Sequence, residues 1–136
     1  GNMGTIFRTA AASGVGCVLL SPYCADPYNP KVLRSGMGAH FRLPIIEAKW
    51  FEIQNYCQPL KVYVAMGEGD TRYDKVDWRE NWALIIGNEG HGVSEESLAL
   101  ATAKIYIPMS KETESLNAGI ATGVILFEAA RQRFVG

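Results

Sequence analysis

The chain has 136 residues and a mass of 14.9 kDa, which suits one domain with its own hydrophobic core better than two. Hydrophobic residues make up 48% and charged residues 20%, a balance typical of a globular protein and not of a disordered one. Thirteen Lys and Arg against fourteen Asp and Glu leave a net charge of −1, so RNA binding would need a local basic patch. No apolar run approaches the roughly 18 residues of a transmembrane helix.

The cysteines and histidines exclude further classes. Cys17, Cys24 and Cys57 are odd in number and show no Cys-x-x-Cys spacing, which argues against a disulfide framework or a zinc knuckle. We therefore expect a reducing compartment, the cytoplasm, with an organelle left open. Only His40 and His91 are present, so we expect no metal site, and we expect His40 in a loop or on the surface.

Segments typical of helices and strands alternate along the chain. The first three are a helix over residues 5–12 capped by Asn2, a strand over 17–20, and a helix over 31–35 behind the cap-like pair Asn29-Pro30, with Gly36 past its end. A strand at 43–46, a helix at 50–57, and strands at 60–66 and 82–86 follow. The chain closes with a helix from Ser94 to about residue 101, a strand at 105–109 and a helix from 115 to about 134.

The expected strands are mostly continuous apolar runs, which is typical of strands buried on both faces. Their alternation with helices predicts an α/β fold with a mostly parallel sheet flanked by helices. Ligands of such sheets bind beyond the carboxyl ends of the strands. The polar or glycine-rich turns there are Gly36–Gly38, Gly87–Gly92 and the stretch from Pro108 to Asn117.

The last helix has two distinctive features. One is an apolar seam at helical spacing, formed by Leu116, Ile120, Val124 and Phe127. The other is a set of residues small enough for another backbone to approach, namely Ala118, Gly119, Ala121 and Gly123.

Each candidate site residue also has a structural interpretation. The run Gly87-Asn88-Glu89-Gly90-His91-Gly92 has the wrong spacing for a dinucleotide fingerprint, and predicts either a tight backbone cradle or an ordinary turn. Glu89 is then either a solvated turn residue or a carboxylate aimed into the ligand crevice, while Ser115 is a site residue or a simple N-cap. Arg8 is a site residue or a solvated helix residue. Three tryptophans are expected in the core, Trp50, Trp78 and Trp82.

Three ordered blocks of sequence point to one family. The blocks are Asn2-Met3-Gly4-Thr5-Ile6-Phe7-Arg8-Thr9-Ala10, then Leu84-Ile85-Ile86-Gly87-Asn88-Glu89-Gly90-His91-Gly92-Val93, then Ile105–Met109 continuing to Glu114-Ser115-Leu116-Asn117-Ala118. A fourth stretch, Arg34–Ala39 with Phe41, matches a common family segment. The chain resembles, over essentially its whole length, the SpoU (TrmH-like) family of S-adenosylmethionine-dependent RNA ribose 2'-O-methyltransferases in the SPOUT superfamily.

The resemblance implies a fold, a cofactor and partners. The expected fold is a parallel sheet with a C-terminal deep trefoil knot, and the expected assembly is a homodimer through the knot region and the last helix. Because the chain starts inside the first block, we expect the family's first strand and any upstream RNA-binding segment to be absent from these 136 residues. The expected substrate is ribosomal or transfer RNA. The knot loops would hold S-adenosylmethionine through Met66, Gly67, Gly87, Glu89, Gly92, Ile107, Met109 and Leu116.

The resemblance also assigns roles to individual residues. Arg8 would bind the phosphate next to the target and stabilise the developing alkoxide, because a guanidinium is too basic to act as a literal base. The ribose, Arg8 and the loops would be positioned by Asn2, Glu89, Ser115 and Asn117. RNA affinity would depend on Arg8, Arg34, Arg42 and Lys111. The alternatives are a non-catalytic RNA-binding module with the same fold and, less favoured, a hydrolase using Ser115 or Cys57.

Overall fold

The computed structural model describes residues 2–88, 91–110 and 116–135. Two 3-10 turns accompany the regular elements, η1 (Ala39–Phe41) and η2 (Tyr73–Lys75). The helices are α1 (Asn2–Ser13), α2 (Pro30–Gly36), α3 (Trp50–Cys57), α4 (Glu95–Leu100) and α5 (Ala118–Val135). The strands are β1 (Val18–Leu20), β2 (Ile45–Glu47), β3 (Lys61–Ala65), β4 (Thr71–Arg72), β5 (Trp82–Ile85) and β6 (Ala103–Tyr106).

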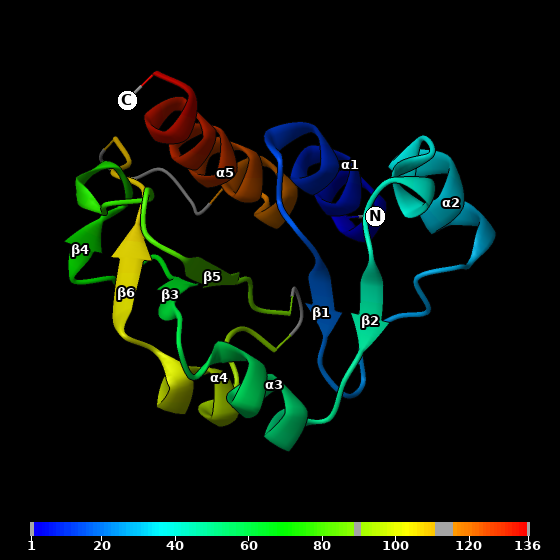
Figure 1. Cartoon of the computed structure of the whole chain (residues 1–136), viewed down its shortest axis with the longest axis horizontal. Coiled ribbons are helices and arrows are strands. Elements are labelled where there is room, and N and C mark those ends of the chain that lie inside the picture. Colours follow the sequence, from blue (N-terminus) through cyan, green and yellow to red (C-terminus); the bar gives the residue numbers. More distant parts are fainter. Residues whose placement is uncertain (1, 89–90, 111–115, 136) are drawn as a thin grey trace.

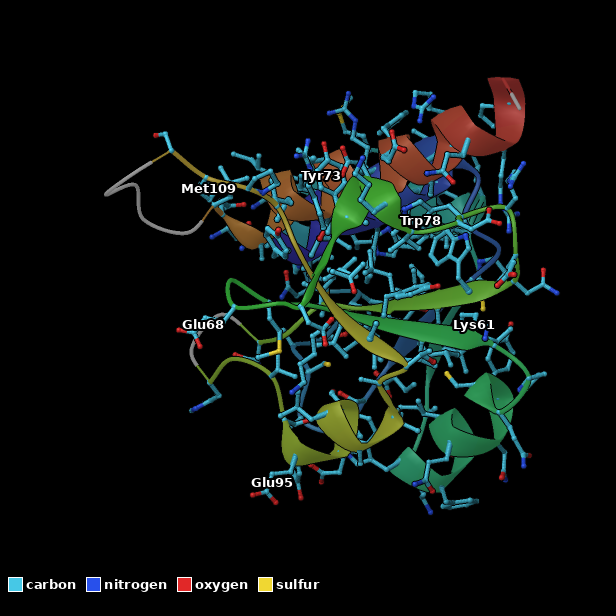
Figure 2. The ribbon with its side chains drawn as sticks, turned by 90° about the vertical axis from the view of Figure 1, so that its left-hand side faces the viewer. Lys61, Glu68, Tyr73, Trp78, Glu95 and Met109 are labelled. Carbon is cyan, nitrogen blue, oxygen red and sulfur yellow. The ribbon has the colours of Figure 1, made fainter. Side chains whose placement is uncertain are left out.

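All strand pairs within these elements are parallel. β1 pairs with β2, and a second sheet has the order β4-β6-β3-β5. Figure 1 shows α5, α1 and α2 on one side of the strands and α3 and α4 on the other, and Figure 2 shows the same layers from the side. The α/β fold with a mostly parallel sheet flanked by helices is therefore confirmed.

Local capping explains where several helices begin. The Asn29 side chain accepts a hydrogen bond from Val32 N at 3.0 Å, with Pro30 in the first turn of α2. The Ser94 hydroxyl accepts one from Ser97 N at 3.1 Å at the start of α4, as expected. α2 includes Gly36, so the residue past its end is Met37, which adopts left-handed backbone at φ 47°.

The first and last helices differ from expectation at their ends. α1 begins at Asn2, three residues before the expected start. α5 begins at Ala118, where the Asn117 side chain accepts hydrogen bonds from Gly119 N at 2.8 Å and Ile120 N at 3.3 Å. Asn117 is therefore the cap of α5, and Ser115 lies outside the described residues.

The tryptophans lie in or beside the core, as predicted. Trp78 is fully buried and packs edge-on against Tyr63 and Trp82, each with ring centroids 5.1 Å apart. Trp50 packs against the cluster around Ile53 on the other side of the sheet. His40 lies in η1, in the connection between α2 and β2, but it is partly buried there and its Nε2 hydrogen-bonds the Pro27 carbonyl at 2.7 Å.

α5 packs on α1 through its small residues. A Cβ on Gly119 would lie 3.5 Å from Thr5 Cγ2, and a Cβ on Gly123 would lie 3.7 Å from Thr9 Cγ2. The small residues of α5 thus face α1 at ordinary van der Waals distance from its threonine side chains. The apolar seam does not turn wholly inward, since Ile120 is 58% exposed and Phe127 50%. The buried residues of α5 are Gly119, Thr122, Ile125, Leu126, Ala129 and Ala130.

Sequence analysis missed the two-residue strand β4, and its position matters for the topology. β6 lies between β3 and β4, although residues 66–70 alone connect these two strands. A Cβ on Gly69 would lie 2.6 to 2.9 Å from backbone atoms of Lys104 and Ile105, so the connection crosses β6 in direct contact.

Among the described residues, no helix is both long and apolar enough to span a bilayer.

Candidate active site

Three loops leave the same edge of the larger sheet. They follow the carboxyl ends of β6, β3 and β5, which are adjacent in that order. Figure 2 shows Glu68 and Met109 on one side of the molecule and Lys61, the first residue of β3, toward the other. Met66 N donates to the Ile105 carbonyl at 2.9 Å, which ties the first loop to β6 at its origin. The geometry matches the edge at which parallel α/β sheets bind ligands.

The loop after β5 is closed on itself by backbone hydrogen bonds. Asn88 N donates to the Gly92 carbonyl at 3.0 Å, and Gly92 N donates back to the Asn88 carbonyl at 2.7 Å. Gly92 has φ 68°, and a Cβ on Gly87 would lie 2.9 to 3.0 Å from the backbone of Gly92 and Val93. Glycine is therefore required at Gly87 by lack of space, and the hydrogen bonds between Asn88 and Gly92 close a tight turn. Glu89 lies outside the described residues.

The predicted cofactor residues of the other two loops lie at the same edge. Met66 and Gly67 follow β3 directly, and Ile107 follows β6. Met66, Ile107 and Leu116 are half-buried, whereas Met109 is 40% exposed. Apolar side chains and a glycine cradle at one sheet edge form a site of the composition expected for a small organic ligand.

The N-termini of α1 and α5 meet beside this edge. A Cβ on Gly119 would lie 3.2 Å from Asn2 Oδ1 and 3.1 Å from Asn117 Oδ1. Two asparagines from opposite ends of the chain thus lie beside Gly119, and a Cβ added there would require their side chains to shift by a few tenths of an ångström. Asn117 is held there by its two capping hydrogen bonds to the first turn of α5.

Arg8 lies on the outward side of α1. One face of α1, with Gly4 and Phe7, meets α2 and η1. Another face, with Thr5 and Thr9, meets α5. At about 3.6 residues per turn, Arg8 falls between these two faces. Its side chain is exposed and takes part in no ion pair among the described residues. A guanidinium in this position is available to bind a phosphate.

The remaining predicted residues are placed as follows. Arg34 is exposed on α2 and Arg42 is exposed directly after η1. Lys111 and Ser115 lie outside the described residues. The structure therefore brings Asn2 and Asn117 together and puts Met66, Gly67, Gly87 and Ile107 on one sheet edge.

Two residues near this edge were missed by sequence analysis. Gly69 was given no role by the sequence analysis, yet it makes the crossing over β6 possible. Asp70 N continues that contact by donating to the Lys104 carbonyl at 2.9 Å. The only signal was a second glycine two residues after Gly67, and the crossing it serves depends on a strand 35 residues later.

The clearest pKa shifts belong to packing contacts away from these loops. Burial raises the pKa of the Cys57 thiol, and the hydrogen bond with Cys17 raises the pKa of the neighbouring Tyr56. The Arg79 guanidinium, 2.9 Å from Asp77, holds the pKa of that carboxyl below its usual range. These shifts are explained by local structure.

The fold and the site define a class, an α/β domain whose ligand loops leave the carboxyl edge of a parallel sheet next to a helix that carries an arginine. Residues 1–127 match the family model described as the SpoU rRNA Methylase family, and the chain belongs to that family.

Individual relatives agree with this assignment. An uncharacterized tRNA/rRNA methyltransferase of Synechocystis is 38% identical over 98% of this chain and 50% of its own length. The 23S rRNA (guanosine(2553)-2'-O)-methyltransferase RlmP of Bacillus subtilis is 35% identical over 93% of this chain and 52% of its own length. The crystal structure of the SpoU methyltransferase AviRb from Streptomyces viridochromogenes with AdoMet superposes with a TM-score of 0.93 at 33% identity, covering 99% of this chain and 56% of AviRb. The chain spans about half the length of these relatives.

Proposed function

We propose that this chain catalyses S-adenosylmethionine-dependent methylation of a ribose 2'-hydroxyl in structured ribosomal or transfer RNA. The observation that carries the proposal is the meeting of the first and third sequence blocks at Gly119, where Asn2 and Asn117 share one space beside the ligand loops. RlmP is named as a 2'-O-methyltransferase of 23S rRNA, and other relatives are named as rRNA or tRNA methyltransferases.

The residues at the sheet edge fit the cofactor. The close approach of Gly87 to Gly92 shapes the loop after β5, and Met66, Ile107, Met109 and Leu116 offer apolar surface for an adenosine. S-adenosylmethionine supplies an electrophilic methyl group, and its sulfur leaves as a neutral thioether. The protein therefore needs to do little for the leaving group.

The harder task is to make a ribose hydroxyl nucleophilic and to align it with the methyl carbon. Arg8 binds the phosphate next to the target and stabilises negative charge that develops on the 2'-oxygen. Asn2 and Asn117 orient the ribose from the base of α1 and α5, and Glu89 and Ser115 complete this set. The proton leaves to an acceptor other than Arg8, because a guanidinium stays protonated in proteins and has no acceptor atom to offer.

We also propose the knot and the homodimer of the family. The knot is supported by β6, which lies between β3 and β4 while the short connection 66–70 crosses it at Gly69. The dimer is supported by the exposed part of the α5 seam, Ile120 and Phe127, which a second copy would cover.

The proposed compartment is the cytoplasm or, as in relatives named as mitochondrial, an organelle.

The test is transfer of labelled methyl from S-adenosylmethionine to total RNA, followed by mapping of ribose 2'-O-methylation. Arg8→Ala should abolish transfer while calorimetry still detects binding of S-adenosylhomocysteine. Arg79→Ala is a matched control, because it removes an exposed arginine that pairs only with Asp77 and its transfer should stay at the wild-type level. Retained turnover in Arg8→Ala would refute the role of Arg8. If the wild-type chain bound RNA without the cofactor and transferred no methyl group, the alternative of a non-catalytic RNA-binding module would be favoured.

A further inference from the structure

A group of large apolar side chains is exposed beside α1. Phe41 is 93% exposed, Met37 62% and Tyr28 57%. They come from η1, the end of α2 and the loop before α2, the segment at the far end of the helix row in Figure 1. Arg34 and Arg42 are also exposed. We call these five residues, Tyr28, Arg34, Met37, Phe41 and Arg42, the α2–η1 platform. Exposed apolar side chains grouped in this way mark an interaction surface.

The platform is held rigidly. Met37 and Gly38 adopt consecutive left-handed conformations, φ 47° and 85°, and Phe41 N donates to the Gly38 carbonyl at 3.1 Å. The His40 ring packs against buried Phe7 at 5.3 Å and against Tyr28 at 5.7 Å between ring centroids. Aromatic side chains presented on a fixed backbone lose little entropy when a flat ligand stacks on them.

The surroundings of the platform are basic. Residues 1–46 contain four of the thirteen basic side chains and one of the fourteen acidic ones, so this part carries +3 and the remainder −4. The four cations are Arg8, Lys31, Arg34 and Arg42, and none forms an ion pair among the described residues. Three arginines in the remainder do pair, with Asp74, Asp77 and Glu128. Unpaired cations next to exposed aromatic rings match the charge and the flat bases of a nucleic acid.

The platform also adjoins Arg8. Gly4, one turn before Arg8, packs against Ser35 and lies so close to Gly36 N that an added Cβ would come within 2.9 Å. Phe7, the residue before Arg8, contacts the His40 ring. A chain of nucleotides that reaches Arg8 would therefore continue over the end of α2 and η1.

We propose that the α2–η1 platform binds unpaired nucleotides that flank the methylation target. Phe41 and Tyr28 stack on bases, while Arg34 and Arg42 bind phosphates. The proposal rests on the proposed function, since it assumes an RNA substrate at Arg8. Stacking requires bases that are not already paired and stacked, so the platform selects single-stranded segments over duplex.

The test measures, by fluorescence anisotropy, how tightly the full chain binds a uridine-rich RNA hairpin with 2-aminopurine in its unpaired loop. The control RNA is the same hairpin with its loop paired to a complementary oligonucleotide. Phe41→Ala should weaken binding of the open loop about tenfold, the effect of losing one aromatic–base stack, and should reduce the 2-aminopurine quench. Phe41→Trp should restore both. Arg42→Ala should instead lower the slope of log affinity against log salt by about one.

Phe51→Ala is the matched control, because Phe51 is 60% exposed on α3 across the sheet, and it should bind like wild type. The platform proposal would be overturned if Phe41→Ala bound the open loop with wild-type affinity, or if it lost as much affinity for the closed loop as for the open one. A change of oligomeric state in Phe41→Ala on sedimentation would overturn it in favour of a protein contact. If only the platform proposal is wrong, Phe41→Ala binds the open loop with wild-type affinity and still methylates RNA. If the proposed function fails, wild type transfers no methyl group to any RNA.

Discussion

Asn117 has two tasks at the residue scale. It caps α5 through hydrogen bonds to Gly119 N and Ile120 N, and its side chain shares the space at Gly119 with Asn2. A residue that both starts a helix and faces a site couples stability to activity, and two substitutions can separate these tasks.

Asn117→Ala removes the cap and should lower the free energy of unfolding by about 1 kcal/mol, together with methyl transfer. Asn117→Asp keeps an oxygen that accepts the same two hydrogen bonds but loses the amide donor. It should unfold in urea like wild type and still transfer methyl poorly. Equal activity of Asn117→Asp and wild type would show that Asn117 serves α5 alone.

Gly69 and Gly67 form a natural pair of test and control. A Cβ on Gly69 would press on the backbone of Ile105 and Lys104, whereas nothing lies within 4 Å of the position of a Cβ on Gly67. Gly69→Ala should therefore destabilise the fold by about 1–3 kcal/mol, measured by urea unfolding, because rigid backbone must shift. Gly67→Ala should leave the stability unchanged, and a comparable loss in both would contradict the close crossing of β6.

At the scale of elements, the C-terminal half of α5 is tied to the segment before β5 by one side chain. Gln132 Oε1 accepts from the buried Trp78 N at 2.8 Å, and its Nε2 donates to the Val76 carbonyl at 3.0 Å and to Glu128 at 2.8 Å. Arg131 also donates to Glu128, at 2.8 Å. Helix and loop thus share one hydrogen-bonded cluster.

The carboxyl group of Glu128 makes this cluster sensitive to acid. Hydrogen bonds from Arg131, and then Gln132, hold the pKa of Glu128 below its usual range. A lowered pKa stabilises the fold above the unfolded value of about 4.3, and this contribution is lost as the pH falls through the lower folded value. Because the pair is partly exposed, Glu128→Gln should cost at most about 1 kcal/mol at pH 7. Urea unfolding should show that the difference from wild type shrinks below pH 4, and Arg131→Ala should behave alike.

For the whole molecule, sequence predicted the kinds of element better than their contacts. Continuous apolar runs located β1, β2, β3, β5 and β6 within a few residues. The burial on both faces that such runs predict is seen in β3, where Val62–Val64 are buried, and not in β2, where Ile46 is 48% exposed. β4 has two residues, Thr71 and Arg72, and no such signal. Asn2 and Asn117 both lie beside Gly119 although almost the entire chain separates them, so only the family resemblance predicted that the two are neighbours. Likewise, packing on α1 decided which side of α5 is buried, and Ile120 and Phe127 were left outside.

That exposed part of the seam gives the final prediction, which concerns assembly. Ile120 and Phe127 are already exposed in one chain, so Ile120→Asp with Phe127→Asp should leave helicity and urea unfolding of the monomer unchanged. In a homodimer that buries them, paired carboxylates would be desolvated and repel one another, and sedimentation velocity should show a shift to monomer. Tyr23→Asp, at a fully exposed residue after β1, should leave the dimer intact. A double variant that sediments as wild type would exclude α5 as the contact.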